Sequence, residues 1–204
     1  MTEILFTVLQ DILFFVLLIG GGWFFGRAFY KIYKGEPVFA KKVFTATENG
    51  IYKIMGVDPK EEMTAKKYAL GILLFSVFSL IFFIAVVMLQ AFLTMNPEHI
   101  EGMSWHLAFN TAASFVTNTN WQAYSGETGL SYLSQMICLT VQNFVSGAVG
   151  IAVLFALIRG FVGRQKKTIG NCWADITRVT LFMIPVCFVG AFILVSQGVP
   201  QTMS

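Results

Sequence analysis

The amino-acid sequence predicts an all-α membrane protein with four transmembrane helices and one re-entrant helix that ends in a polar loop. Of its 204 residues, 56% are hydrophobic and only 12% are charged, about half the charged share of a typical soluble domain. Residues 12–25 and 68–93 contain no Asp, Glu, Lys or Arg, and about 20 apolar residues cross a bilayer as a helix. Residues 103–121 are also apolar but too short to cross, so they should enter the membrane and return.

The four predicted spans are residues 4–25, 68–93, 130–158 and 173–197. The first has the position of a signal peptide, but Glu3 and Asp11 stand where a signal peptide carries basic residues, so we expect it to remain in the protein. The third contains Gln135, Gln142 and Asn143. Polar side chains within a span usually face other helices or a water-filled path, and for Gln142 and Asn143 contacts between helices are the favoured interpretation.

The distribution of Lys and Arg predicts the orientation. Nine of the 14 basic residues lie between Arg27 and Lys67, and the other five lie between Arg159 and Arg178. Short loops that are rich in Lys and Arg stay cytoplasmic. Both termini and residues 94–129 should therefore be outside. This topology also accounts for the net charge of +3, which is no indication of nucleic-acid binding.

The chain accordingly divides into five parts. These are a first transmembrane helix (1–30), a cytoplasmic loop (31–67), a helix–pore–helix repeat with its filter loop at 116–121 (68–158), a second cytoplasmic loop (159–172), and a fourth transmembrane helix with an external tail (173–204). The first cytoplasmic loop contains two short amphipathic pieces around residues 43–55 and a turn at 56–59. It is interpreted as an interfacial helix, with a mobile linker as the alternative.

The re-entrant segment carries the chemistry. Ser104 is a candidate N-cap, and about twelve helical residues from there to Phe115 would extend roughly 18 Å, a little over half the hydrocarbon depth. The next residues, Thr117-Asn118-Thr119-Asn120, each offer a main-chain carbonyl and a side-chain oxygen, which are neutral ligands suited to a dehydrated alkali cation. The C-terminal end of the preceding helix carries a partial negative charge that favours a cation. The alternative is a buried polar loop that only caps the helix.

Other chemistries find less support. Ser125-Gly126 lies outside any G-x-S-x-G motif, so an intramembrane serine protease is disfavoured. Cys138, Cys172 and Cys187 lack the spacing of a metal site and are interpreted as packing residues. No aspartyl-phosphate or Walker A motif is present in the sequence. The order of helix, pore helix, filter loop and helix is the plan of one potassium-channel-like repeat.

Several longer runs closely resemble one family. They are SFVTNTNWQAYSGE at 114–127, LSYLSQM at 130–136, TVQNFVSGAVGIAVLFALIRGF at 140–161, GMSWHLAFNTA at 102–112, the Gly-Val-Asp turn at 56–58 and the Gly-Asn-Cys-Trp-Ala-Asp stretch at 170–175. This pattern resembles KdpA, the potassium-binding A subunit of the bacterial ATP-driven potassium uptake system, in its N-terminal portion. The first helix corresponds only in placement and polarity.

The resemblance implies a subunit of the bacterial plasma (inner) membrane that binds external potassium and passes it through an intramembrane tunnel to a P-type ATPase partner. The subunit itself would be non-catalytic, with potassium as its ion and no organic cofactor. The implied partners are the catalytic subunit, small accessory membrane subunits and the lipid bilayer, with no nucleic acid. The implied potassium-binding residues are Val116, Thr117, Asn118, Thr119, Asn120 and Gln122, while Trp121 and Tyr124 would wedge the loop against neighbouring helices.

The sequence departs from the family in length. A KdpA chain ordinarily continues through four repeats, each of which contributes one filter loop, whereas this sequence contains one repeat and one further helix. One loop cannot close a ring of ligands. We therefore expect a fragment or a second chain that supplies the missing repeats. The alternatives are a homotetrameric potassium channel, and an assembly module or non-functional fragment.

Overall fold

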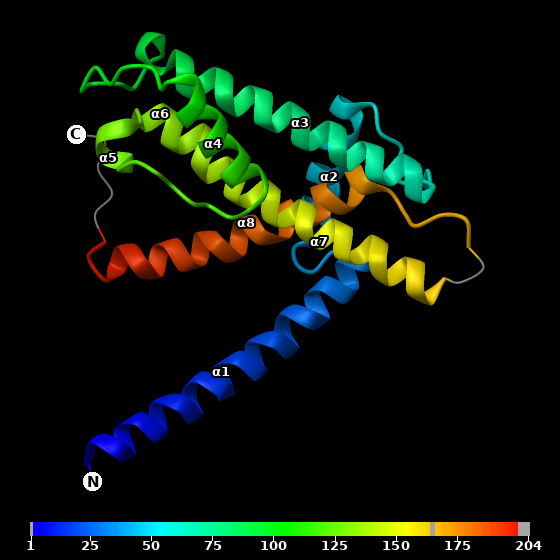
Figure 1. Ribbon diagram of the computed structural model, residues 1–204. Helices are drawn as coiled ribbons and strands as arrows, with labels where there is room; N and C mark the ends of the chain where they lie inside the picture. Colours follow the sequence, from blue (N-terminus) through cyan, green and yellow to red (C-terminus); the bar gives the residue numbers. More distant parts are fainter. Residues whose placement is uncertain (1, 164–165, 200–204) are drawn as a thin grey trace. The chain divides into compact units, whose positions relative to one another are not determined.

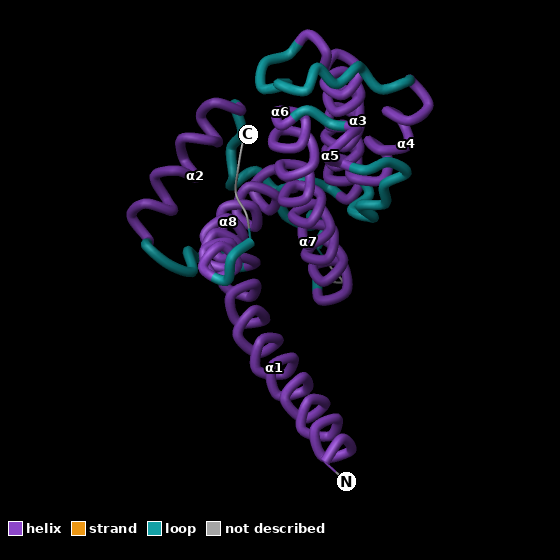
Figure 2. Tube along the Cα trace, turned by 90° about the vertical axis from the view of Figure 1, so that its left-hand side faces the viewer, coloured by secondary structure: helices purple, strands orange, loops and turns teal. Residues whose placement is uncertain are grey.

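The computed structural model describes residues 2–163 and 166–199, and within these ranges the chain forms helices and no strands (Figures 1 and 2). The all-α prediction is confirmed. The predicted tail beyond Val199 lies outside the described residues. The elements are α1 (Thr2–Tyr33), α2 (Lys41–Met55), α3 (Ala65–Leu89), η1 (Gln90–Phe92), α4 (Trp105–Val116), α5 (Gly126–Gly129), α6 (Tyr132–Ser134), η2 (Gln135–Thr140), α7 (Val141–Val162) and α8 (Cys172–Ser196).

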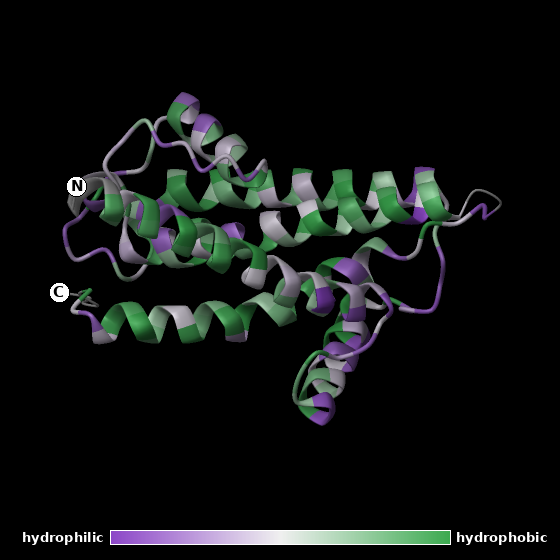
Figure 3. Ribbon diagram, turned by 90° about the horizontal axis from the view of Figure 1, so that it is seen from below, coloured by the Kyte–Doolittle hydropathy of each residue, from purple (hydrophilic) through white to green (hydrophobic). Residues whose placement is uncertain are grey.

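Within the described ranges, four helical segments are long and apolar enough to cross a membrane, which confirms the predicted number of spans. They are Leu5–Tyr33, Ala65–Phe92, Tyr132–Val162 and Cys172–Ser196. Figure 3 shows these long helices as predominantly hydrophobic, with hydrophilic residues gathered in the connecting segments. The first helix continues to Tyr33, well beyond the predicted end at residue 25. Arg27 and Lys31 do not end it, because long basic side chains can place their charge at the membrane surface while the stem stays apolar.

The chain forms two compact units, residues 1–47 and 48–204. In the first unit, large apolar side chains are exposed around the whole of α1 between Leu5 and Phe25. A helix that is apolar all round is suited to lipid and not to water. Residues 41–55 form the single helix α2, so the prediction of two short pieces was wrong. Gly50 is tolerated inside it, because one interior glycine costs only about 1 kcal/mol relative to alanine.

The core of the second unit is built around the short helix α4, which packs against α3 and α7 (Figure 1). Ala108 and Ala112 of α4 are fully buried, and their small side chains allow the neighbouring helices to approach closely. Phe115 packs on Phe83 of α3 with ring centroids 5.7 Å apart. The buried cluster also contains Val87. These contacts fix α4 by its last turn, from which the polar loop continues.

A buried ion pair joins three spans at the other end of α3. Asp175 of α8 is 1% exposed. Its two carboxylate oxygens accept hydrogen bonds from Arg159 of α7, with Nη2 3.0 Å from Oδ1 and Nη1 bound to Oδ2. The Tyr68 hydroxyl of α3 lies 3.0 Å from Asp175 Oδ2 and 2.8 Å from the carbonyl oxygen of Ala152. Arg159 also donates to the Ile169 carbonyl at 3.1 Å. The carboxylate is thus bonded on both oxygens, as a buried charge requires.

Asn171 joins two sequence motifs that lie more than 100 residues apart. Its Oδ1 accepts hydrogen bonds from the N–H groups of Trp173 and Ala174 at the start of α8, at 3.0 and 3.3 Å. Its Nδ2 donates to the carbonyls of Asp58 and Glu61, at 3.0 Å each. One side chain therefore caps α8 and fixes the turn that follows α2.

The turn before α4 requires a glycine. A Cβ on Gly102 would lie 2.2 Å from the main-chain oxygen of Met88, at the point where Met103 N–H donates to the Val87 carbonyl at 3.1 Å. We expect Gly102→Ala to lower the free energy of unfolding by about 1–3 kcal/mol, as overpacking does. Gly150→Ala is the control, since its Cβ would meet nothing within 4 Å. Equal unfolding midpoints for the two variants in a detergent titration would contradict this prediction.

Candidate functional site

Gln90 holds together the two ends of the segment that contains α4. Its side chain is fully buried, and Nε2 donates to the carbonyl of Glu101, before α4, at 2.7 Å and to that of Gly129, after the polar loop, at 3.0 Å. Its Oε1 accepts from Ser131 N–H at 3.1 Å. The segment therefore leaves and returns at the same end of α3, as a re-entrant segment must. Its depth in a membrane stays a prediction.

Gln90→Leu tests this arrangement. The change leaves one buried N–H and two carbonyls without a partner, and unsatisfied buried groups cost about 1–3 kcal/mol. We expect faster hydrogen exchange of the amides in α4 and in residues 117–121. Gln10→Leu makes the same chemical change on the exposed surface of α1 and should leave exchange at those amides unaltered. The same exchange rates in both variants would show that Gln90 does not close the segment.

The main chain after α4 turns its N–H groups back toward the helix. Ser104 is the N-cap of α4 by position, although its side chain makes no capping bond, and the helix covers the predicted residues. Five consecutive N–H groups, from Thr117 to Trp121, then donate to the last turn of α4. Their acceptors, in order, are Ala113 O at 3.0 Å, Phe115 O at 3.2 Å, Ser114 O at 2.9 Å, Ser114 O at 3.2 Å and Ser114 Oγ at 2.5 Å.

These bonds fix the direction of five carbonyl groups. In a trans peptide the C=O points opposite to the N–H of the next residue, and none of the described peptide bonds is cis. The carbonyls of residues 116–120 therefore all point away from α4. Asn118 and Asn120 make this possible with φ of 59° each, because alternating right- and left-handed residues gather N–H groups on one side of the chain. Asn tolerates the left-handed region better than most residues do.

These carbonyls remain available. Among the hydrogen bonds of the described chain, none is accepted by a main-chain oxygen of residues 117–120, and these four residues are exposed. Their side chains are more engaged. The Thr117 hydroxyl donates to the Ala113 carbonyl at 2.9 Å and lies 3.0 Å from that of Thr119, while Asn118 Oδ1 accepts from Ser146 at 3.1 Å. Main-chain and side-chain oxygens were both predicted as ligands, and the main-chain oxygens make fewer hydrogen bonds within the described chain.

The residues after the loop form a polar mouth. Gln122 is exposed and its Nε2 lies 3.4 Å from the Tyr124 hydroxyl. Tyr124 packs against the core cluster as expected, and its burial raises the pKa of the phenol. Trp121 does not wedge against helices of the described chain, since it is 58% exposed. A 2.5 Å hydrogen bond from the Ser125 hydroxyl lowers the pKa of the exposed Glu127 carboxyl.

Sequence reasoning missed three residues that position the loop, namely Gln90, Ser114 and Ser146. The only signal for Ser114 was its place in the last turn of a predicted helix. Of the polar residues in the third span, Gln142 is buried and Asn143 is exposed. Gln142 thus faces the packed interior, in line with the favoured interpretation, and Asn143 does not.

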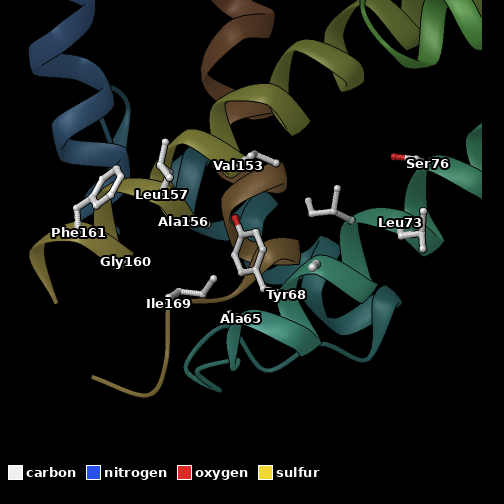
Figure 4. A pocket seen from close by; sticks show the side chains of 12 residues that line it. Ala65, Tyr68, Leu73, Ser76, Val153, Ala156, Leu157, Gly160, Phe161 and Ile169 are labelled. Atoms are coloured by element: carbon white, nitrogen blue, oxygen red, sulfur yellow. The ribbon is translucent and has the colours of Figure 1, made fainter. Parts of the chain in front are cut away.

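A cavity lies away from the loop. It is a groove of about 670 Å³ between α3 and α7, and Figure 4 shows its side chains. They are almost all apolar and include Ile72, Leu73, Val153 and Leu157, while the Tyr68 hydroxyl that reaches it is bonded to Asp175 and Ala152. A dehydrated cation would find no set of oxygen ligands there, so the polar loop is the better candidate site.

Comparison with known proteins gives consistent matches. The family model described as "Potassium-transporting ATPase A subunit" (KdpA) matches residues 12–204. The chain is 54% identical over 198 residues to the potassium-transporting ATPase potassium-binding subunit of Listeria monocytogenes serotype 4a, covering 97% of this chain and 35% of the relative. It is 54% identical over 195 residues to the protein of the same name from Clostridium botulinum strain Eklund 17B, covering 95% and 34%. The chain thus spans about a third of the length of the curated relatives that it matches.

Proposed function

The chain belongs to the KdpA family of potassium-transporting ATPase A subunits, and from this premise we propose that its filter loop, residues 116–121, binds potassium from outside the cell. The observation that carries the proposal is the row of carbonyls from Val116 to Asn120 that point away from α4. Gln122 would complete the site at the outer mouth. Within this segment, the proposed potassium-binding residues are the six that the family resemblance indicated, namely Val116, Thr117, Asn118, Thr119, Asn120 and Gln122.

The chemistry of the loop suits potassium. A dehydrated alkali cation is bound by several neutral oxygens that replace its water shell, and main-chain carbonyls supply them without a carboxylate. The C-terminal end of α4 adds a partial negative charge behind the loop, on the order of half an elementary charge before screening. Because residues 117–120 are exposed, the loop has room for further ligands.

One loop provides one part of a ring. We assign residues 68–158 to the first of four helix–pore–helix repeats, with the re-entrant helix α4 and the filter loop inside the membrane. The remaining loops would come from further repeats, in the same polypeptide or in a second chain. The chain covers 35% of a relative's length, which supports this division of the filter.

The proposed role is a non-catalytic one within an ATP-driven uptake complex. Potassium bound at the filter passes through an intramembrane tunnel to a catalytic P-type ATPase subunit, with small accessory membrane subunits beside it. The complex lies in the bacterial plasma membrane with both termini of this chain outside. The relatives' names, which give a potassium-binding subunit of a potassium-transporting ATPase, support this role.

The test is reconstitution of the uptake complex that contains this chain in proteoliposomes. We expect potassium uptake from micromolar external potassium that requires ATP, and ATP hydrolysis that potassium stimulates. The chain alone, in matched liposomes, should pass no potassium. A chain that runs as a tetramer and conducts potassium without ATP would favour a homotetrameric channel instead. Absence of any response to potassium in both preparations would favour an assembly module.

A further inference from the structure

We propose that Ser146 is a positioning residue that holds Asn118 in its left-handed conformation and thereby sets the ion discrimination of the filter. This inference rests on the proposed function and adds a residue of another helix to it. Ser146 lies on α7, is 4% exposed, and its hydroxyl lies 3.1 Å from Asn118 Oδ1 and 2.7 Å from the Gln142 carbonyl. Its single proton is shared between these two acceptors.

Asn118 is the point at which the loop is tied to a neighbouring helix. The other side-chain bonds within residues 117–120 join Thr117 and Thr119 to each other and to the last turn of α4. The bond to Ser146 crosses 28 residues of sequence. It fixes the position of the Asn118 side chain relative to α7, because the buried Ser146 side chain does not move with the loop.

The conformation of Asn118 controls the carbonyls on both sides of it. Its φ of 59° lies in a region that costs an L-residue about 1–2 kcal/mol, less for Asn. If Asn118 relaxed to the right-handed region, the two peptide units that flank it would rotate. The carbonyls of Thr117 and Asn118 would then leave the row. A hydrogen bond that fixes the Asn118 side chain restricts this rotation. It therefore helps to set the diameter of the ring of carbonyl oxygens to which this loop contributes.

The π-helix η2 brings Ser146 to this position. It covers Gln135–Thr140, directly before α7, and the Thr140 hydroxyl donates to the Gln135 carbonyl at 3.2 Å. One extra residue in a helical turn rotates everything after it by about 100° relative to a continuous α-helix. In a continuous α-helix of the same sequence, Val145 would lie near the place of Ser146, and it has no hydroxyl to offer.

The experiment measures potassium against rubidium in competitive uptake by the reconstituted complex. Rubidium is the larger congener, so its exclusion reports the size of the ring. We expect Ser146→Ala to lower the preference for potassium about three- to tenfold, the factor that one hydrogen bond supplies. Ser146→Thr keeps the hydroxyl and should retain the wild-type preference. Asn118→Gly keeps the left-handed backbone accessible but removes the tether, so it should lower the preference to a similar extent.

The most decisive comparison uses the double variant of Ser146→Ala and Asn118→Gly. If Ser146 acts only through Asn118, Ser146→Ala should have no further effect in the Asn118→Gly background. An added loss there, or an unchanged preference in Ser146→Ala, would overturn the inference. Should Ser146→Ala fail to assemble, Asn118→Gly decides alone, and an unchanged preference in it overturns the inference. ATP-dependent potassium uptake by the wild-type complex tests the proposed function separately, so a failure of this inference is distinguishable from a failure of the proposed function.

Discussion

Replacement of Thr117, Asn118, Thr119 and Asn120 by alanine is expected to abolish potassium uptake at micromolar external potassium. The physical reason lies in the main chain. Two of the four positions have φ of 59°, and alanine there costs about 1–2 kcal/mol at each position. Together these amount to roughly 2–4 kcal/mol, or about 30- to 1,000-fold fewer molecules with aligned carbonyls. Initial rates of uptake by proteoliposomes over a range of external potassium measure the loss.

A second variant separates main-chain from side-chain ligands. It has alanine at Thr117 and Thr119 and glycine at Asn118 and Asn120. Glycine adopts the left-handed region without strain, so this variant can keep the row of carbonyls while it lacks all four polar side chains. We expect it to retain ATP-dependent uptake, with weaker discrimination between ions. Equal loss of uptake in both variants would mean that the side-chain oxygens are the ligands after all.

Asp175→Asn is expected to lower the free energy of unfolding of the complex by about 3–5 kcal/mol, because it leaves the partly buried Arg159 guanidinium without its counter-charge. Side-chain exposure is 2% for Asp175 and 17% for Arg159, so water compensates the loss poorly. The Tyr68 hydroxyl also loses a charged acceptor. The thermal midpoint and the denaturant midpoint of the purified complex both measure this effect.

The matched control is Glu61→Gln, which breaks the Lys67–Glu61 pair, whose side chains are both 54% exposed. Exposed pairs contribute about 0–1 kcal/mol, so this variant should unfold close to wild type. The double variant Asp175→Leu with Arg159→Met removes both charges and should recover much of the stability. If Asp175→Asn unfolded like Glu61→Gln, the buried pair would not be what joins α3, α7 and α8.

The sequence located the spans and the short helix before the loop, because both depend on properties that add up along the chain. A run of apolar residues either is or is not long enough for a bilayer, and Ser104 to Val116 had the length and composition of a helix that stops partway. The continuation of α1 to Tyr33 and the unbroken α2 were missed. Helical hydrogen bonding continues past Arg27 in α1 and through Gly50 in α2, since neither residue by itself ends a helix.

The polar run Thr117–Asn120 marked the candidate site by composition alone, but its geometry depended on partners that the sequence could not indicate. Ser131 lies 41 residues from Gln90, and Ser146 lies 28 residues from Asn118. Composition also gave equal weight to side-chain and main-chain oxygens. Only the hydrogen bonds of the folded chain showed which of them are free.

By itself, then, the sequence determined that this is a four-span helical membrane protein with one polar loop after a short helix, and the resemblance of its motifs placed it in the KdpA family. The tertiary structure decided the direction of the carbonyls from Val116 to Asn120, the closure of the segment by Gln90 and the buried pair of Arg159 with Asp175. The physical reason is that hydropathy is a sum over neighbours in sequence, whereas a hydrogen bond depends on direction and on residues that folding alone brings together.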